Sequence, residues 1–192
     1  MNPMNDTRTQ ILDAAQDMLQ RQSISGVSFQ ELANRIGIKK GSMYYHFQSK
    51  DALSIAILER ATSDMKEAFK RGESKPAEQQ LAYFLGIFRR FMGNSEKICP
   101  GGAFAGEWDK LNEPVQLAAS TLINVQTQGV KKIIECGIKS GEFNDHGQSS
   151  TELALWTIST IQGALLISRM GGNPASFESS IKVHMQYLLD IH

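Results

Sequence analysis

The amino-acid sequence predicts an all-α protein of about nine helices. Along most of its 192 residues, apolar side chains recur at spacings of three and four, which places them on one face of a helix. Capping residues precede many of these runs and glycines follow them, as they do at helix boundaries. No segment shows a sustained alternation of apolar and polar residues bounded by hairpin turns, so we expect no β-sheet.

The first helix is expected from Asn5 or Asp6 to Arg21, and it should brace the helices that follow. Its buried stripe consists of Ile11, Leu12, Ala15, Met18 and Leu19.

Two short helices joined at Gly37 come next, because glycine adopts backbone conformations that are costly for other residues. The first opens with Ser28 and Glu31, a capping box in which each side chain bonds a free backbone N–H of the other's turn. The second should bury Met43 and Phe47, which lie four residues apart. The remaining side chains of this second helix are hydrogen-bond donors and flat rings, a surface that suits a phosphate-lined groove.

The same boundary signals define the rest of the chain. The expected segments are a helix capped by Ser49 and ending at Gly72, an apolar helix from Leu81 to Met92, short helical sequence between Gly102 and Trp108, a long helix from Pro114 to Ser140, a helix opened by the capping box of Ser149 and Glu152 and ending at Gly171, and a last helix opened by Asn173 and Pro174.

Charge is unevenly distributed although the net charge is zero. Residues 21–50 contain five basic side chains and one acidic side chain, a net charge of +4, so the remainder carries −4. Contacts to nucleic-acid phosphates depend on local charge and donor geometry, so a neutral chain with a basic face can bind nucleic acid.

The run from Ile36 to Leu53, Ile-Gly-Ile-Lys-Lys-Gly-Ser-Met-Tyr-Tyr-His-Phe-Gln-Ser-Lys-Asp-Ala-Leu, resembles the signature of tetracycline-repressor-type (TetR/AcrR) transcriptional regulators. The resemblance extends back to Thr7 and forward to about Ala61, and it is weaker beyond. It implies a helix-turn-helix DNA-binding domain over residues 5–50, with the helix-turn-helix proper at 28–47. A connecting helix over 51–72 and a ligand-binding and dimerisation domain over 73–192 would follow.

Residue chemistry and the family's pattern together assign roles in binding a double-stranded DNA operator. Lys40, Ser42 and Tyr45 are candidates for contacts to base edges, and Gly41 lets the backbone approach the duplex. Contacts to phosphates, which fix register without choosing sequence, are assigned to Tyr44, His46 and Lys50. For Tyr44 a partly buried, structural ring is an equal alternative. Ser28 and Lys39 complete the set of candidate DNA-binding residues.

Lys39 departs from the family's pattern, in which Ser or Thr caps the recognition helix. Losing a cap costs about 1 kcal/mol of helix stability. A lysine also puts positive charge at the positive end of the helix dipole until a phosphate arrives. We therefore expect Lys39 to face DNA, and the alternative is a solvated lysine without a role.

The resemblance also implies a pocket for a small-molecule inducer of unknown identity in the C-terminal domain. Large or adaptable side chains of the kind that line apolar ligand sites are candidates for its lining, although each also suits a plain core. They are Phe84, Phe88, Met92, Phe104, Trp108 and Trp156.

The last two helices carry apolar residues over a wider arc than one buried stripe requires. Two interpretations are open. These helices either complete the core of the monomer or pack against a second copy as a four-helix bundle, which the resemblance implies. A twofold dimer would read a palindrome with recognition helices about 34 Å or more apart.

Cysteine chemistry offers an alternative trigger. Cys99 precedes Pro100 at an expected helix N-terminus, where a thiolate would be favoured, so redox or electrophile sensing competes with a buried, inert role. Cys136 lies within an apolar helical pattern and is expected to be structural.

An enzyme and a helical scaffold that never binds DNA are the other hypotheses. The histidines lack metal-ligand spacing, no nucleophile elbow or phosphate-binding loop occurs, and Glu107 and Asp109 would diverge around a helix. We expect no catalytic residue, metal or cofactor. A scaffold would make the residues from Lys39 to Lys50 a coincidence, and salt-dependent binding to duplex DNA would exclude it.

The sequence also predicts a cytoplasmic protein that does not enter a membrane. No stretch of about 18 uncharged apolar residues occurs, and the N-terminal residues lack the hydrophobic core of a signal peptide.

Overall fold

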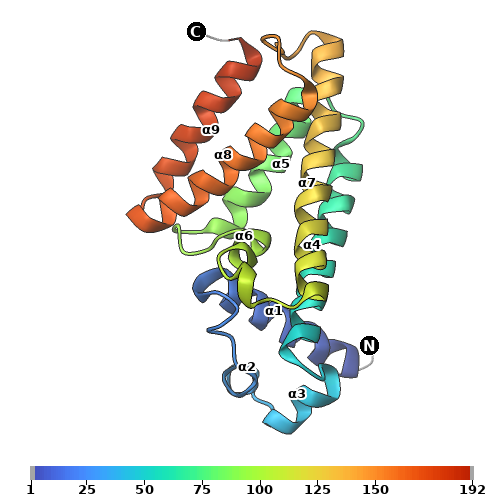
Figure 1. The fold of residues 1–192 in the computed structure, drawn as a ribbon, viewed down its shortest axis with the longest axis vertical. Coiled ribbons are helices and arrows are strands. Elements are labelled where there is room, and N and C mark those ends of the chain that lie inside the picture. The colour runs from blue at the N-terminus through green and yellow to red at the C-terminus, as the bar shows by residue number, and fades with distance from the viewer. Residues whose placement is uncertain (1–2, 191–192) are drawn as a thin grey trace. The chain divides into compact units, whose positions relative to one another are not determined.

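The computed structural model describes residues 3–190, with side chains from Thr7 onward (Figure 1). Within this range the chain forms nine α-helices and one 3-10 turn and contains no strand, which confirms the predicted all-α fold. The elements are α1 (Pro3–Gln22), α2 (Phe29–Ile36), α3 (Lys40–His46), α4 (Lys50–Gly72), α5 (Ala77–Met92), α6 (Pro100–Ala105), η1 (Trp108–Lys110), α7 (Glu113–Ser140), α8 (Ser150–Gly171) and α9 (Pro174–Leu189).

Two compact units share these helices. One consists of the residues up to Thr62 together with Pro100–Leu122, and the other consists of Ser63–Cys99 and the residues from Ile123 onward. The sequence predicts a DNA-binding domain over residues 5–50, a connecting helix over 51–72 and a C-terminal domain over 73–192. In the structure, residues 100–122 belong to the N-terminal unit, where α6 contacts α1. Helical periodicity shows which face of a helix is buried but not which other helix covers it.

In the N-terminal unit, α1 supplies the core against which the short helices pack. Its predicted stripe is buried throughout: Ile11, Leu12, Ala15, Met18 and Leu19. The helix begins at Pro3, earlier than predicted, because proline fits the first helical position, where the missing N–H would have no partner.

The second unit has a core of aromatic and branched side chains from α5, α7, α8 and α9. Its members include Phe84, Phe88, Val130, Ile134, Ile161 and Phe177. Helix α7 packs against the ring of Phe69 at Gly129, which has no side chain. A Cβ atom on Gly129 would lie 2.2 Å from two carbons of that ring, so only glycine fits here without movement.

Helices α8 and α9 form an antiparallel pair in this unit (Figure 1). The predicted capping box of Ser149 and Glu152 is confirmed, and Asn173 caps α9 by accepting a hydrogen bond from the N–H of Ala175 at 3.0 Å. Between the two helices Gly172 has φ of 58°, the left-handed conformation that ends a helix at low cost for glycine.

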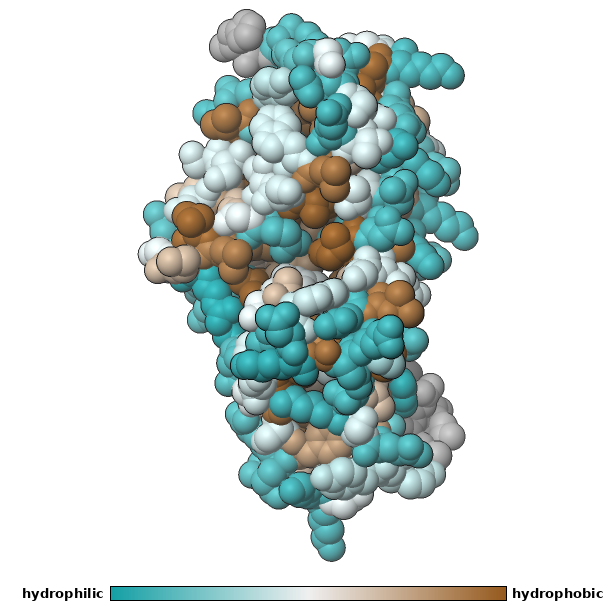
Figure 2. Space-filling view, in the orientation of Figure 1, coloured by the Kyte–Doolittle hydropathy of each residue, from teal (hydrophilic) through white to brown (hydrophobic). Residues whose placement is uncertain are grey.

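Helix α8 is apolar on two faces. One face lies in the core, while apolar side chains are also exposed on the surface formed by α8 and α9 (Figure 2): Leu155, Trp156, Leu166, Ile167, Met170, Val183 and Tyr187. Among the described residues, α8 is also the one helix long and apolar enough to cross a membrane, although 44% of its apolar window is buried within the protein. A helix that packs on two sides has the same composition.

Candidate nucleic-acid interface

The helix-turn-helix is built by local hydrogen bonds that the sequence encodes. The hydroxyl of Ser28 accepts a hydrogen bond from the backbone N–H of Glu31 at 3.1 Å, which is the serine half of the predicted capping box. Gly37 ends α2 with φ of 75° and ψ of 30°, and its N–H donates to the carbonyl of Ala33. This left-handed residue turns the chain so that α3 can begin three residues later.

Helix α3 is divided into a buried and an exposed face, as predicted. Met43 is fully buried within it and Phe47, directly after it, is 3% exposed. The opposite face turns Lys40, Gly41, Ser42, Tyr44 and Tyr45 to solvent, and His46 is half-buried. This row places donors, a cation and two phenol rings on one outward surface.

Both predicted roles of Tyr44 fit its position. Its side chain is 50% exposed, and its ring packs edge-on against Phe29 with centroids 5.2 Å apart. Tyr45 is 71% exposed and packs edge-on against His46 at 5.3 Å. Both rings therefore pack against a neighbouring ring while a large part of each side chain is exposed.

A groove of about 510 Å³ lies beside this row. It is lined by Val27, Ser28, Phe29, Gln30, Lys40, Tyr44, Gln48, Ser49 and Lys50. The N-termini of α2 and α4 both border it, and Ser49 caps α4 by accepting a hydrogen bond from the N–H of Ala52 at 3.0 Å. Helix N-termini carry partial positive charge, so two of them beside two lysines form a surface that favours an anionic phosphate.

Lys39, which precedes α3, and Lys50, which follows it, differ in their hydrogen bonds. Lys50 is half-buried, and its ammonium donates to the backbone carbonyl of Ser25 at 3.3 Å. Lys39 occupies the N-cap position with φ of −76° and ψ of 143°, is exposed, and makes no capping bond through its side chain. Lys39 therefore presents a cation to solvent at the start of α3.

The six candidates for the lining of a ligand pocket are divided between the two compact units. Phe84, Phe88 and Met92 lie in the core of the second unit. Trp156 is in the same unit but is 40% exposed, and its ring lies 4.2 Å from that of His184 and 4.9 Å from that of Tyr187. The other two belong to the N-terminal unit, where one is buried and one is exposed: Phe104 and Trp108.

The structure differs from the sequence prediction at one of the two cysteines, Cys136. Cys99 directly precedes α6, as expected, but only 1% of it is exposed, and its sulfur lies 3.9 Å from the side-chain nitrogen of Gln126. Cys136 was predicted to be structural, yet it is exposed on α7. The buried stripe there is centred near Ile134, and Cys136 lies beyond the edge of that stripe.

Sequence reasoning missed Ser25 and Glu107 as parts of this region. The backbone N–H of Ser25 donates to a carboxylate oxygen of Glu107 at 3.0 Å. The sequence holds no local signal for this contact, because the two residues are far apart along the chain and each is unremarkable in its own segment.

Two short helices in a tight turn, the second of which presents lysine, serine and tyrosine side chains, define a helix-turn-helix DNA-binding domain. The model of the family described as "Bacterial regulatory proteins, tetR family" matches residues 11–57, which contain this motif. This match and the relatives described next support a TetR/AcrR-type regulator, and the members of that family are transcriptional regulators and not enzymes.

The chain is also similar in sequence to transcriptional repressors and in fold to a TetR-family regulator of solved structure. Over 106 residues the chain is 27% identical to the HTH-type transcriptional repressor NemR of Escherichia coli strain K12, covering 53% of this chain and 50% of that one. The chain therefore aligns with about half of the length of NemR. It is 25% identical over 188 residues to the HTH-type transcriptional repressor DhaR of Mycobacterium sp. strain GP1, covering 95% and 92%. A TetR-family regulator from Agrobacterium tumefaciens shares the fold, with a TM-score of 0.89 at 22% identity over 98% of this chain and 100% of that chain.

Proposed function

We propose that this chain is a cytoplasmic transcriptional regulator, a repressor, that binds a palindromic operator as a homodimer and is released by a small-molecule inducer. The observation that carries the proposal is the exposed face of α3 beside a groove bordered by two helix N-termini and two lysines. Repression is favoured because the relatives NemR and DhaR are both described as repressors.

Within the interface, we assign Lys40, Ser42 and Tyr45 to base edges, because all three lie on the exposed face of α3. Lys50 borders the groove between the two helix N-termini, which suits a contact to a phosphate. Lys50→Ala should then weaken binding to all sequences about equally, whereas Lys40→Ala should also relax the preference for the operator.

Selection of bound sequences from random duplex DNA tests the proposal directly. A palindromic consensus is the expected outcome, and titrations at several salt concentrations should give a logarithmic slope that reflects several phosphate contacts. Binding that is independent of salt, or absent for every duplex, would exclude the regulator function. If Lys50→Ala leaves the slope unchanged, Lys50 is not a phosphate contact.

Dimerisation through α8 and α9 is supported by the exposed apolar side chains on these two helices. Met170, 84% exposed at the end of α8, is the sharpest probe. Met170→Glu should shift the protein from dimer to monomer in sedimentation experiments and weaken binding to a palindrome more than to a half-site. Leu117→Glu is the matched control, because Leu117 is an exposed apolar residue on α7. Equal sedimentation of Met170→Glu and the unmodified protein would argue against this interface.

For the inducer, the core of the second unit around Phe84, Phe88 and Met92 offers apolar lining that a ligand could enter by displacing side chains. A ligand shifts the protein only if it binds one conformation better than the other. A screen for compounds that release the protein from its selected operator identifies such a ligand, and variants at these three positions should change the concentration it requires.

A further inference from the structure

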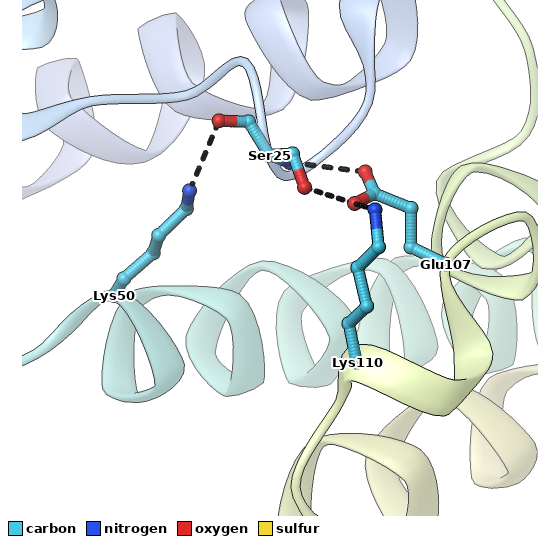
Figure 3. A network of polar contacts seen from close by, with 4 residues as sticks. All are labelled: Ser25, Lys50, Glu107 and Lys110. Atoms are coloured by element: carbon cyan, nitrogen blue, oxygen red, sulfur yellow. Dashed lines mark hydrogen bonds and ion pairs between the residues drawn. The ribbon is translucent and has the colours of Figure 1, made fainter.

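The carboxylate of Glu107 forms hydrogen bonds with the turn between α1 and α2. Glu107, in the segment between α6 and η1, accepts hydrogen bonds from both the backbone N–H of Ser25, at 3.0 Å, and the hydroxyl of Ser25 (Figure 3). Lys110 adds an ion pair at 3.4 Å. The Glu107 side chain is 10% exposed, whereas its partners Ser25 and Lys110 lie at the surface.

Hydrogen bonding keeps this carboxylate charged. The hydroxyl of Ser23, followed by the hydroxyl and the backbone N–H of Ser25, lowers the pKa of Glu107 to about 2. The turn that it binds is itself unusual, because Ser23 has φ of 75°, a left-handed conformation that a residue with a side chain adopts at a cost. An ionised acceptor that bonds both serines offsets that cost.

Ser25 is also bonded from its other side. Its backbone carbonyl accepts the ammonium of Lys50 at 3.3 Å (Figure 3). Lys50 begins α4 and borders the groove beside α3. Ser25 therefore links Glu107 to a lysine of the candidate interface, and the link consists of hydrogen bonds that can be removed one at a time.

A second contact anchors the same segment near the start of α4. The side-chain amide of Asn112 donates to a carboxylate oxygen of Asp51 at 2.7 Å, while its oxygen caps α7 by accepting the N–H of Val115 at 3.1 Å. Residues 107–112 thus touch both the Ser25 turn and the first turn of α4. The segment that carries Glu107 is therefore attached at Glu107 to the Ser25 turn and at Asn112 to the first turn of α4.

We propose that Glu107 is a positioning residue for DNA binding: by fixing Ser25, it holds the Lys50 ammonium at the edge of the groove, where a phosphate of duplex DNA binds. This proposal rests on the proposed DNA-binding function. It assigns a role in DNA binding to a residue outside the segment 11–57 that the family model matches.

Glu107→Ala tests the proposal in DNA titrations at several salt concentrations. We expect a loss of affinity of about three- to tenfold and a salt slope smaller by about 0.9, the equivalent of one phosphate contact. In a Lys50→Ala background the same change should have less than about a twofold further effect, because the lysine that Glu107 positions is already absent. Removing a negative charge would by itself favour DNA, so Glu113→Ala, which removes an exposed carboxylate just beyond Asn112, is the matched control and should not weaken binding.

The outcomes are distinct. Additive losses in the double variant, or an unchanged salt slope for Glu107→Ala, would overturn the positioning role while leaving the DNA-binding function intact. If the unmodified protein binds no duplex DNA, the proposed function fails, and this proposal fails with it. Should Glu107→Ala not fold by circular dichroism, Ser25→Ala, which removes the hydroxyl bond and keeps the N–H bond, must give a smaller loss of the same kind, and no loss would refute the proposal.

Discussion

Lys39 should trade stability for DNA affinity, and Lys39→Ser separates the two. The residue has the extended backbone of an N-cap and no capping bond, so a serine there can accept a hydrogen bond from the N–H of Gly41 or Ser42. The new cap should contribute about 1 kcal/mol. Removing a cation from the positive end of the helix dipole adds about 0.5 kcal/mol. A gain of about 1.5 kcal/mol corresponds to a melting temperature roughly 3–6 °C higher for a chain of this size.

The same substitution should weaken DNA binding. Without the Lys39 ammonium, one phosphate contact is lost, and the salt slope should fall by about 0.9. Lys39→Ala is the matched control: it removes the charge but provides no cap, so it should match Lys39→Ser in DNA titrations and melt at a lower temperature. Equal melting temperatures for the two variants would refute the capping argument. A salt slope equal to that of the unmodified protein would show that Lys39 does not contact a phosphate.

Three further outcomes are expected. Gly129→Ala should destabilise the protein by about 1–3 kcal/mol in urea unfolding, because the added methyl group collides with the Phe69 ring. Gly86→Ala in α5, where the methyl group has room, should instead stabilise the protein by up to about 1 kcal/mol, and a gain in stability for both variants would contradict this packing. Burial lowers the pKa of His184 from 6.5 to about 4, so between pH 4 and 6.5 the unfolded chain binds more protons than the folded protein. The free energy of unfolding should therefore fall by about 3 kcal/mol as the pH drops from 6.5 to 4, and His184→Gln should flatten this dependence. Cys99→Ser should keep the normal response to inducer and lose no response to oxidants or electrophiles, because the thiol is buried; loss of such a response would support thiol sensing.

Elements set by local bonds could be predicted from the sequence. The caps at Ser28, Ser49 and Ser149 join residues three apart, and the turn at Gly37 needs a conformation that glycine adopts freely. The division of α3 into buried and exposed faces likewise follows from helical periodicity, with Met43 inside. These features require no knowledge of which helices are neighbours.

The contacts that complete the candidate site could not be predicted in this way. Spacing along the chain compares Glu107 only with nearby Asp109, whereas its actual partner Ser25 lies 82 residues away. The exposure of Cys136 does not follow from its apolar pattern, because such a pattern gives the direction of a buried stripe without its width. The aromatic candidates for the ligand pocket share their chemistry, and chemistry alone does not separate buried Phe104 from exposed Trp108.

The brevity of α3 explains why residues outside the motif should matter for DNA binding. With seven residues and no side-chain cap, this helix is far below the length of about 12 to 15 residues at which an isolated helix becomes marginally stable. Its geometry must therefore come from tertiary contacts: Met43 and Phe47 fix the side away from solvent, and the Lys50 to Ser25 to Glu107 chain of bonds fixes the start of α4. Since residues 100–122 belong to the same compact unit, the structural unit that presents the candidate DNA-binding face is larger than the matched family segment. Sequence changes in the α6 to α7 connection should consequently alter DNA affinity even though they leave every residue of the motif in place.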